Sequence, residues 1–171
     1  MIPKIRKSEK EMRRNSGFTI IEMLIVVAIL AMLAGVLVPV LEDSSASARD
    51  ARRAADLKAV QAALEAYKRV NGSYPDTSGA WQGDSTGDGG YGYDATGYIP
   101  GLVPQFMQAL PKDPDSVYPD ATNGYMYRSD GTDYKFALNG TPESFPAGNP
   151  FFDPQRTTTA WQVSTPGGYN W

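Results

Sequence analysis

The stretch "RRNSGFTIIEMLIVVAILAMLAGVLVPVL" (residues 13–41) decides the fold of this chain. From position 18 to position 41 it contains a single charged residue, Glu22. This apolar run exceeds the ~20 residues that an α-helix needs to cross the hydrocarbon core of a bilayer. The preceding residues 1–17 carry six basic and two acidic side chains, and such positive flanks stay in the cytoplasm. We therefore predict one membrane-spanning helix, with the rest of the chain on the far side of the membrane.

Three interpretations of this stretch compete, and Glu22 distinguishes them. A plain signal anchor leaves the glutamate unexplained. A secretory signal peptide would be cut in "SSASA" (residues 44–48), where Ala46 and Ala48 have A-x-A spacing, but the apolar run is longer than that of such peptides. In the third interpretation, a cut before Phe18 creates an α-amine that pairs with Glu22. A carboxylate inside a membrane costs ~2.5–3.5 kcal/mol and is tolerated when it has a partner.

The hexapeptide "GFTIIE" (residues 17–22), behind a basic leader and ahead of an apolar run, resembles the cleavage and methylation motif of type IV pilins and type II secretion pseudopilins. The resemblance implies that a prepilin peptidase cuts after Gly17 and methylates the new N-terminus at Phe18. It also implies that Glu22 pairs with the amine of an adjacent subunit during assembly. Pro39 stands where a proline is common in the family, and we expect it to kink the helix because it removes a backbone hydrogen bond.

The resemblance implies a structural filament subunit that passes once through the bacterial inner membrane, with its C-terminal domain in the periplasm. Its partners would be copies of itself, the prepilin peptidase, the inner-membrane assembly platform and ATPase, minor pilins or pseudopilins, and membrane lipid before assembly. Residues 62–75 and 110–138 resemble the major pseudopilins of type II secretion systems. A surface type IV pilin for adhesion, motility or DNA uptake is the alternative. From another class, the alternative is a membrane-tethered or secreted binding module.

Composition excludes several classes of function. The chain has 171 residues and neither cysteine nor histidine, so disulfides and catalysis by these side chains are excluded. No phosphate-binding loop and no nucleophile motif occurs, and we expect no enzymatic activity. Removal of residues 1–17 takes away six of the 16 basic and two of the 19 acidic residues, which leaves a net charge of −7. An acidic surface argues against nucleic-acid binding.

Aspartates in the predicted loops raise the question of a metal cofactor. Asp84 and Asp88 partly match the start of a calcium loop, but Ala95 stands where the closing glutamate is expected. The resemblance implies calcium in a loop near the sheet of major pseudopilins. By region, the candidate calcium ligands are Asp113, Asp115 and Asp120. In the alternative interpretation these aspartates form turns and solvate loops.

The remaining pattern predicts an α+β fold. Residues 50–70 are rich in helix formers, with an apolar stripe of Leu57, Val60, Leu64 and Tyr67, and the helix should stop at Asn71-Gly72. We divide the chain into a cleaved leader (1–17), a transmembrane and assembly half of the helix (18–41), an amphipathic half (42–72) and a globular domain (73–171).

Strand patterns occupy the second half of the chain. Residues 124–138 read as a hairpin that turns at Asp130-Gly131, and residues 160–165 as a further strand. The side chains expected to face the core are Tyr134, Phe136, Leu138, Trp161 and Val163. We expect a short helix near residues 104–109 and a loop without periodicity over 76–97. A long helix packed on a small antiparallel sheet is also the pilin fold.

Overall fold

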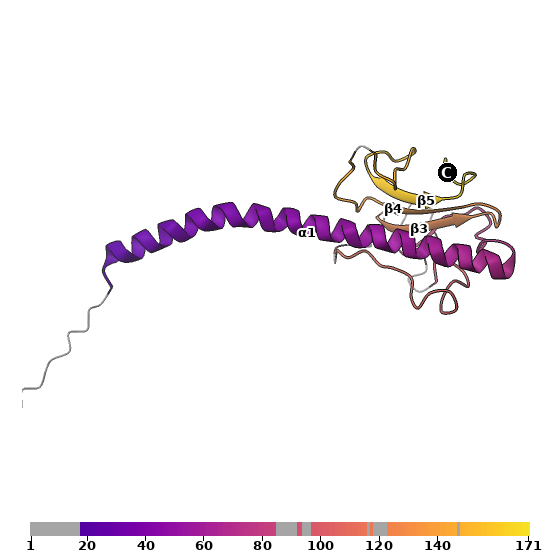
Figure 1. The fold of residues 1–171 in the computed structure, drawn as a ribbon, viewed down its shortest axis with the longest axis horizontal. Coiled ribbons are helices and arrows are strands. Elements are labelled where there is room, and N and C mark those ends of the chain that lie inside the picture. The colour runs from indigo at the N-terminus through magenta and orange to yellow at the C-terminus, as the bar shows by residue number, and fades with distance from the viewer. Residues whose placement is uncertain (1–17, 85–91, 94–96, 116, 118–122, 147) are drawn as a thin grey trace, which may run out of the picture. The chain divides into compact units, whose positions relative to one another are not determined.

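A computed structural model describes residues 18–84, 92–93, 97–115, 117, 123–146 and 148–171, although not the side chains at positions 39, 92 and 93. The chain divides into two units, Met1–Leu41 and Glu42–Trp171. Helix α1 (Ile20–Asn71) contributes its first part to one unit and its second part to the other (Figure 1). The continuous helix predicted from position 18 to Asn71 is therefore confirmed to within two residues.

The end of α1 follows the predicted capping chemistry. The side-chain amide of Asn71 donates to the carbonyl oxygen of Tyr67 at 3.0 Å, and the Gly72 N–H donates to the carbonyl oxygen of Lys68 at 2.8 Å. Gly72 has a φ of +83°, a left-handed conformation that glycine adopts without steric cost. The prediction that the helix stops at Asn71-Gly72 is confirmed.

The sheet of the second unit has the order β2-β1-β3-β4-β5. Its main strands are β3 (Gly124–Ser129), β4 (Tyr134–Asn139) and β5 (Ala160–Ser164), which pair antiparallel and lie against the C-terminal part of α1 (Figure 1). The β3–β4 turn is fixed by the Asp130 carboxylate, which accepts hydrogen bonds from the Thr132 and Asp133 N–H groups. The predicted hairpin and the predicted strand near residue 160 are both confirmed.

The core forms where the apolar stripe of α1 meets one face of this sheet. Leu57, Val60 and Leu64 are fully buried there. The Tyr125 ring stacks on Phe136 at 5.5 Å between ring centroids, and its hydroxyl donates to the Asp56 carboxylate of the helix at 2.9 Å. The five side chains expected to face the core are all buried: Tyr134, Phe136, Leu138, Trp161 and Val163.

Two local predictions are wrong. The segment 76–97 is not only a loop, because β1 (Gln82–Gly83) pairs antiparallel with β3, and β2 (Gly92–Tyr93) pairs parallel with β1. Strands this short show no periodicity in the sequence. No helix forms at residues 104–109, where the chain makes successive turns with one i→i−4 bond, from the Phe106 N–H to the Leu102 carbonyl oxygen. Pro104 has no N–H to contribute to a helical ladder.

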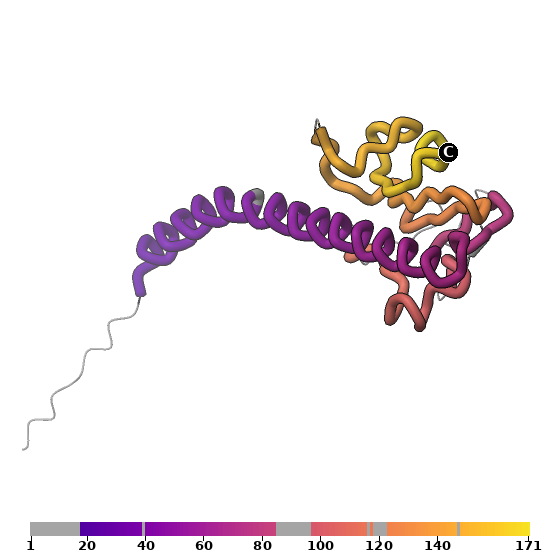
Figure 2. Tube along the Cα trace, turned by 45° about the vertical axis from the view of Figure 1, so that its right-hand side comes forward, coloured from indigo at the N-terminus to yellow at the C-terminus, as the bar shows by residue number. Residues whose placement is uncertain are grey.

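The opposite face of the sheet is buried as well. Alternation along β4 places Lys135 and Ala137 away from α1, yet both are fully buried. The C-terminal segment covers this face and lies on the side of the strands away from α1 (Figures 1 and 2). A side chain at Gly168 would overlap the carbonyl oxygen of Tyr134, so this glycine lets the two backbones meet. The close approach explains the second glycine, Gly168, of "STPGGYNW" (residues 164–171).

We predict that Gly168→Ala destabilises the protein, because the new methyl group meets backbone atoms that cannot move independently of β4. The expected cost is ~1–3 kcal/mol, measured by thermal unfolding. Gly167→Ala is the matched control: its methyl group would meet the Asp133 carboxylate, a side chain that can rotate away. Equal melting temperatures for the two variants would contradict this account of the C-terminal segment.

Candidate functional site

The first turn of α1 is closed by a reciprocal pair of residues. The Glu22 carboxylate accepts hydrogen bonds from the Thr19 N–H at 2.8 Å and from the Thr19 hydroxyl at 2.7 Å. In return, the Thr19 hydroxyl oxygen accepts a hydrogen bond from the Glu22 N–H at 3.3 Å. This arrangement is a capping box, which satisfies backbone donors that a helix N-terminus otherwise leaves free. Thr19 and Glu22 therefore act as one unit.

The capping box changes the explanation of Glu22. The sequence predicts one partner for its carboxylate, the α-amine produced by cleavage. The structure gives it a partner on its own helix, and this partner was missed although the T-x-x-E spacing of residues 19–22 is a sequence signal for it. A carboxylate with two donors is less costly in an apolar medium than a free one.

The other predicted residues of this region are placed only in part. Gly17 lies outside the described residues, and Phe18 is the first described residue, with 78% of its surface exposed. Helix α1 continues through position 39, and the kink expected at Pro39 stays a prediction. Cleavage after Gly17 and methylation of Phe18 likewise stay predictions.

The helix surface of the first unit is apolar on every side. All its large hydrophobic residues between positions 18 and 41 are at least 46% exposed. Helix α1 contains, near its N-terminus, a stretch long and apolar enough to cross a membrane. A helix that is hydrophobic all round is stable in lipid or among similar helices, and not in water.

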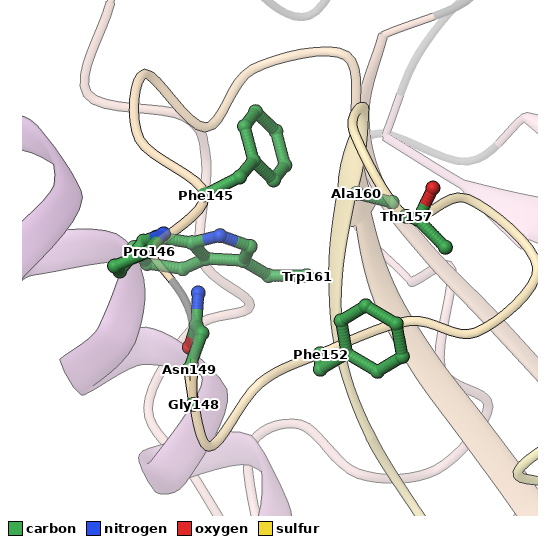
Figure 3. A pocket seen from close by; sticks show the side chains of 8 residues that line it. All are labelled: Phe145, Pro146, Gly148, Asn149, Phe152, Thr157, Ala160 and Trp161. Carbon is green, nitrogen blue, oxygen red and sulfur yellow. The ribbon is translucent and has the colours of Figure 1, made fainter.

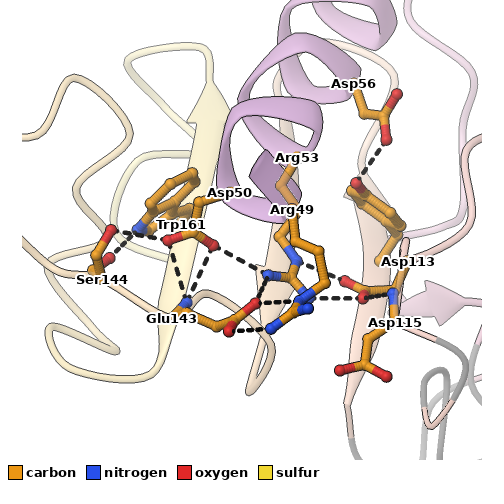
Figure 4. A network of polar contacts seen from close by, with 10 residues as sticks. Arg49, Asp50, Arg53, Asp56, Asp113, Asp115, Glu143, Ser144 and Trp161 are labelled. Atoms are coloured by element: carbon orange, nitrogen blue, oxygen red, sulfur yellow. Dashed lines mark hydrogen bonds and ion pairs between the residues drawn. The ribbon is translucent and has the colours of Figure 1, made fainter. Parts of the chain in front are cut away.

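A charge network fastens loops of the second unit to its part of the helix (Figure 4). The Arg53 guanidinium, with no exposed surface, binds both carboxylate oxygens of Asp113 at 2.7 and 2.9 Å. It also donates to Asp50 at 3.0 Å and to Glu143 at 2.8 Å. Glu143 accepts two further bonds from Arg49, each 2.6 Å long. One helix turn thus holds two segments that are distant from it in sequence.

The electrostatics of the network follow from these contacts. Burial acts against the charged form of Arg53, but the surrounding carboxylates outweigh it and raise the pKa of the guanidinium. Hydrogen bonds from Arg49 and then Arg53 lower the pKa of Glu143 to about 2, against the effect of burial. No sequence pattern identified Arg53, because its partners are 60 and 90 residues away.

The predicted calcium ligands do not form a metal site in the described residues. Asp113 has both carboxylate oxygens bound to Arg53, the Asp115 carboxylate accepts the Val117 N–H at 3.1 Å, and Asp120 lies outside the described residues. Within the described part of the chain, no three His, Cys, Asp or Glu side chains lie close enough to hold a metal ion. Asp113 therefore does not fit the role of a ligand, and calcium binding stays a prediction.

Asp84, from the partial calcium loop, is buried, and within the described residues its carboxylate oxygens have no hydrogen-bond partner. Burial raises the pKa of Asp84 to about 7. Asp88 and Ala95, the other positions of that pattern, lie outside the described residues.

A small hollow beside β5 has aromatic walls (Figure 3). It encloses about 160 Å³ between Phe145, Phe152 and Trp161. Trp161, however, is only 5% exposed: it stacks on Phe151 at 5.7 Å, and its indole N–H donates to the Ser144 carbonyl oxygen at 3.1 Å. The tryptophan is therefore a core residue that also forms one wall of the hollow.

We predict that Thr19→Val loosens the first turn of α1, because valine keeps the shape of threonine but removes the hydroxyl that bonds Glu22. Loss of such a cap costs ~1 kcal/mol, which corresponds to about fivefold faster amide hydrogen exchange at Glu22. The measurement is exchange of the full chain in detergent micelles. Thr19→Ser keeps the hydroxyl and should exchange like the unchanged chain; identical exchange in Thr19→Val would show that the cap contributes nothing.

We also predict that Glu143 stabilises the second unit in a pH-dependent way. Its pKa is depressed in the folded state from 4.5 to about 2, so the stabilisation is complete above pH 4.5 and is lost as the pH falls through about 2. Glu143→Gln should melt below the unchanged chain at neutral pH, and the difference should shrink toward pH 2. Glu42→Gln, at an exposed position of the same unit, is the control. A difference that stays constant with pH would contradict this role.

The N-terminal part of the chain matches a known protein family. Residues 12–38 match the family of the prokaryotic N-terminal methylation motif, and this range includes Gly17, Phe18 and Glu22. No solved structure matches the chain.

Several curated relatives match most of the chain. The type II secretion system core protein G of Vibrio cholerae is 34% identical over 71% of this chain and 76% of its own length. The protein of the same name from Pseudomonas aeruginosa is 33% identical over 74% of this chain and 82% of its own length, and that of Aeromonas hydrophila is 32% identical over 60% and 68%. The chain belongs to the family of type II secretion system core protein G, the major pseudopilins.

Proposed function

We propose that this chain is a structural filament subunit, the major pseudopilin of a type II protein secretion system, and that it polymerises through the first part of α1. The observation that carries the proposal is the apolar surface of residues 18–41, which the described residues of a single chain leave exposed on all sides. The relatives named core protein G favour this function over that of a surface pilus subunit.

The apolar surface of residues 18–41 has two successive surroundings, one before and one after assembly. Before assembly it lies in the inner membrane, where lipid covers it. In the filament, equivalent helices of neighbouring subunits replace the lipid. Both surroundings bury the same side chains, so transfer from one to the other needs only a small change in free energy. An apolar helix provides the attraction between subunits without specifying their stagger along the filament.

Glu22 supplies the polar contact that apolar packing lacks. Cleavage after Gly17 would free the α-amine of Phe18 next to the capping box. The amine of one subunit would then meet the Glu22 carboxylate of its neighbour and set the axial register. Because Glu22 already has Thr19 as a partner, the carboxylate is tolerated in the membrane until assembly supplies the amine.

The basic leader supports a topology with the N-terminus in the cytoplasm and residues 42–171 in the periplasm. Processing requires the prepilin peptidase, and extraction from the membrane requires an assembly platform and ATPase, with minor pseudopilins as further partners. The subunit itself catalyses no reaction. It is cleaved and methylated by the peptidase, and it then packs against other subunits.

The test is expression of Glu22→Leu and Glu22→Gln beside the unchanged chain, in cells with a prepilin peptidase and the assembly machinery. We expect mass spectrometry to find methylated Phe18 at the N-terminus of all three proteins. We expect filaments, counted by electron microscopy, only from the unchanged chain. Removal of the charge lowers the cost of membrane insertion, so a loss of filaments could not be assigned to failed insertion.

Gly17→Leu is the control for processing, since a bulky residue should leave the leader attached. An N-terminus at Arg49 in the unchanged chain would establish a secretory signal peptide and defeat the filament proposal. Normal filaments from processed Glu22→Leu protein would leave the filament function intact, but they would show that apolar packing alone sets the register.

A further inference from the structure

A stack of cationic and aromatic side chains lies on the face of the sheet away from α1. Arg128 is on β3, and alternation along the strand places it opposite Tyr127, which belongs to the core. The guanidinium carbon of Arg128 lies 4.7 Å from the centre of the Trp171 ring and 6.0 Å from the centre of the Trp81 ring. The guanidinium carbon of Arg156 lies 5.2 Å from the centre of the same Trp81 ring. Two arginines thus share one tryptophan.

The two indoles are held in place by contacts that do not involve the arginines. The Trp171 carbonyl oxygen accepts a hydrogen bond from the Lys135 ammonium at 2.7 Å. Two residues before Trp81, the Gly79 N–H donates to the Ser129 carbonyl oxygen of β3 at 2.9 Å. The rings therefore form fixed walls for the guanidinium groups.

The stack leaves hydrogen-bond donors at its edge. A guanidinium is planar and its N–H groups point outward within that plane, so a ring over the plane does not occupy them. Arg128 is partly exposed, and its Nε is buried without a hydrogen-bond partner in the described part of the chain. Arg156 is also partly exposed, and its contact with the Asp153 carboxylate is 3.4 Å long. Both arginines keep donors for a further acceptor.

The patch is positive on an otherwise acidic chain. Three cations gather there: Arg128, Lys135 and Arg156. Two acids of this region are already engaged, Asp153 by Lys135 at 2.9 Å and Asp130 by two N–H groups of its own turn. The chain as a whole has a net charge of −3. A short anionic segment is attracted to such a patch, whereas the rest of the surface repels a long polyanion such as nucleic acid.

Carboxylates match the donors of the patch. The planar fork of an arginine binds a carboxylate through two parallel N–H···O bonds. Side chains on one side of an extended segment are ~7 Å apart, so acidic residues at alternate positions could reach both guanidinium groups beside Trp81. Another copy of the chain would pack through α1, on the other side of the sheet, and this packing leaves the patch accessible.

We propose that Arg128, Arg156, Trp81 and Trp171 form a docking site for an acidic segment of a partner protein other than a second copy of this chain. The segment is extended and carries Asp or Glu at alternate positions. The arginines bind its carboxylates, and the indoles hold the guanidinium groups in the receiving geometry. The proposal goes beyond the filament function and does not depend on assembly.

The test titrates the full chain in detergent micelles, at constant ionic strength, with a synthetic peptide of alternating glutamate and serine. The matched peptide carries glutamine in place of glutamate. Tryptophan fluorescence is the readout, because all three tryptophans lie in the second unit and a peptide on the basic leader leaves them unaffected. We expect the glutamate peptide alone to change the emission, with a Kd below ~1 mM.

Variants locate the binding. Arg128→Gln and Arg156→Gln should each weaken it about tenfold, since each removes charged hydrogen bonds, and Arg128→Lys should restore part of it. Arg69→Gln removes the same charge from an exposed position of α1 and should bind like the unchanged chain. Melting temperatures show which variants are folded, and Arg156→Gln, at a partly exposed position, keeps the test decisive if Arg128→Gln does not fold.

Four outcomes decide the proposal. Binding of the glutamate peptide that both glutamine variants weaken, and Arg69→Gln does not, supports it. No fluorescence change in the unchanged chain up to ~1 mM peptide, or equal weakening by Arg69→Gln, overturns it. Tighter, Arg128-dependent binding of an oligothymidylate also overturns it, because the patch would then recognise phosphate. Self-association that Arg128→Gln abolishes, measured by sedimentation, overturns it as well, because the acidic partner would be a second copy.

Discussion

Helix α1 carries two surfaces with incompatible requirements, and this constraint governs the rest of the chain. Residues 18–41 are apolar on every side and need lipid or other helices around them. Residues 50–70 are apolar along one stripe and need a single partner, which the sheet provides. A chain that must satisfy both requirements cannot bury both surfaces in one core. It packs a globular unit on the second part of the helix and leaves the first part for an environment outside the monomer.

Charges that the apolar surroundings should exclude are tolerated because each has fixed partners. Glu22 is held by Thr19 on its own helix, Arg53 by three carboxylates and Lys135 by Asp153. The first pair is local and shapes a helix end. The other two connect segments that are far apart in sequence, so they determine which loops lie on the helix and which segment covers the sheet. A buried pair of this kind is costly to break on one side only, and this cost makes the arrangement specific.

The two internal cations also bear on the role of the aspartates. Asp113 was a candidate calcium ligand by region, but Arg53 neutralises it. Asp153 had no predicted role, and Lys135 neutralises it. In both places a cationic side chain of the protein neutralises a buried aspartate. Arginine and lysine side chains therefore hold distant segments of the globular unit together.

The sequence alone determined most of what depends on strong local spacing. The helix and its stop at Asn71-Gly72, the hairpin with its turn at Asp130-Gly131 and the core face of β4 follow from patterns a few residues long, since backbone geometry repeats over that distance. The cleavage motif and Glu22 could also be identified locally, and Thr19 was identifiable by the same reasoning. Only the tertiary structure decided that Arg53 meets Asp113, that β1 and β2 extend the sheet, and that the C-terminal segment buries Lys135. Those contacts join residues separated by tens of positions, and their free energy depends on burial, which no local pattern records.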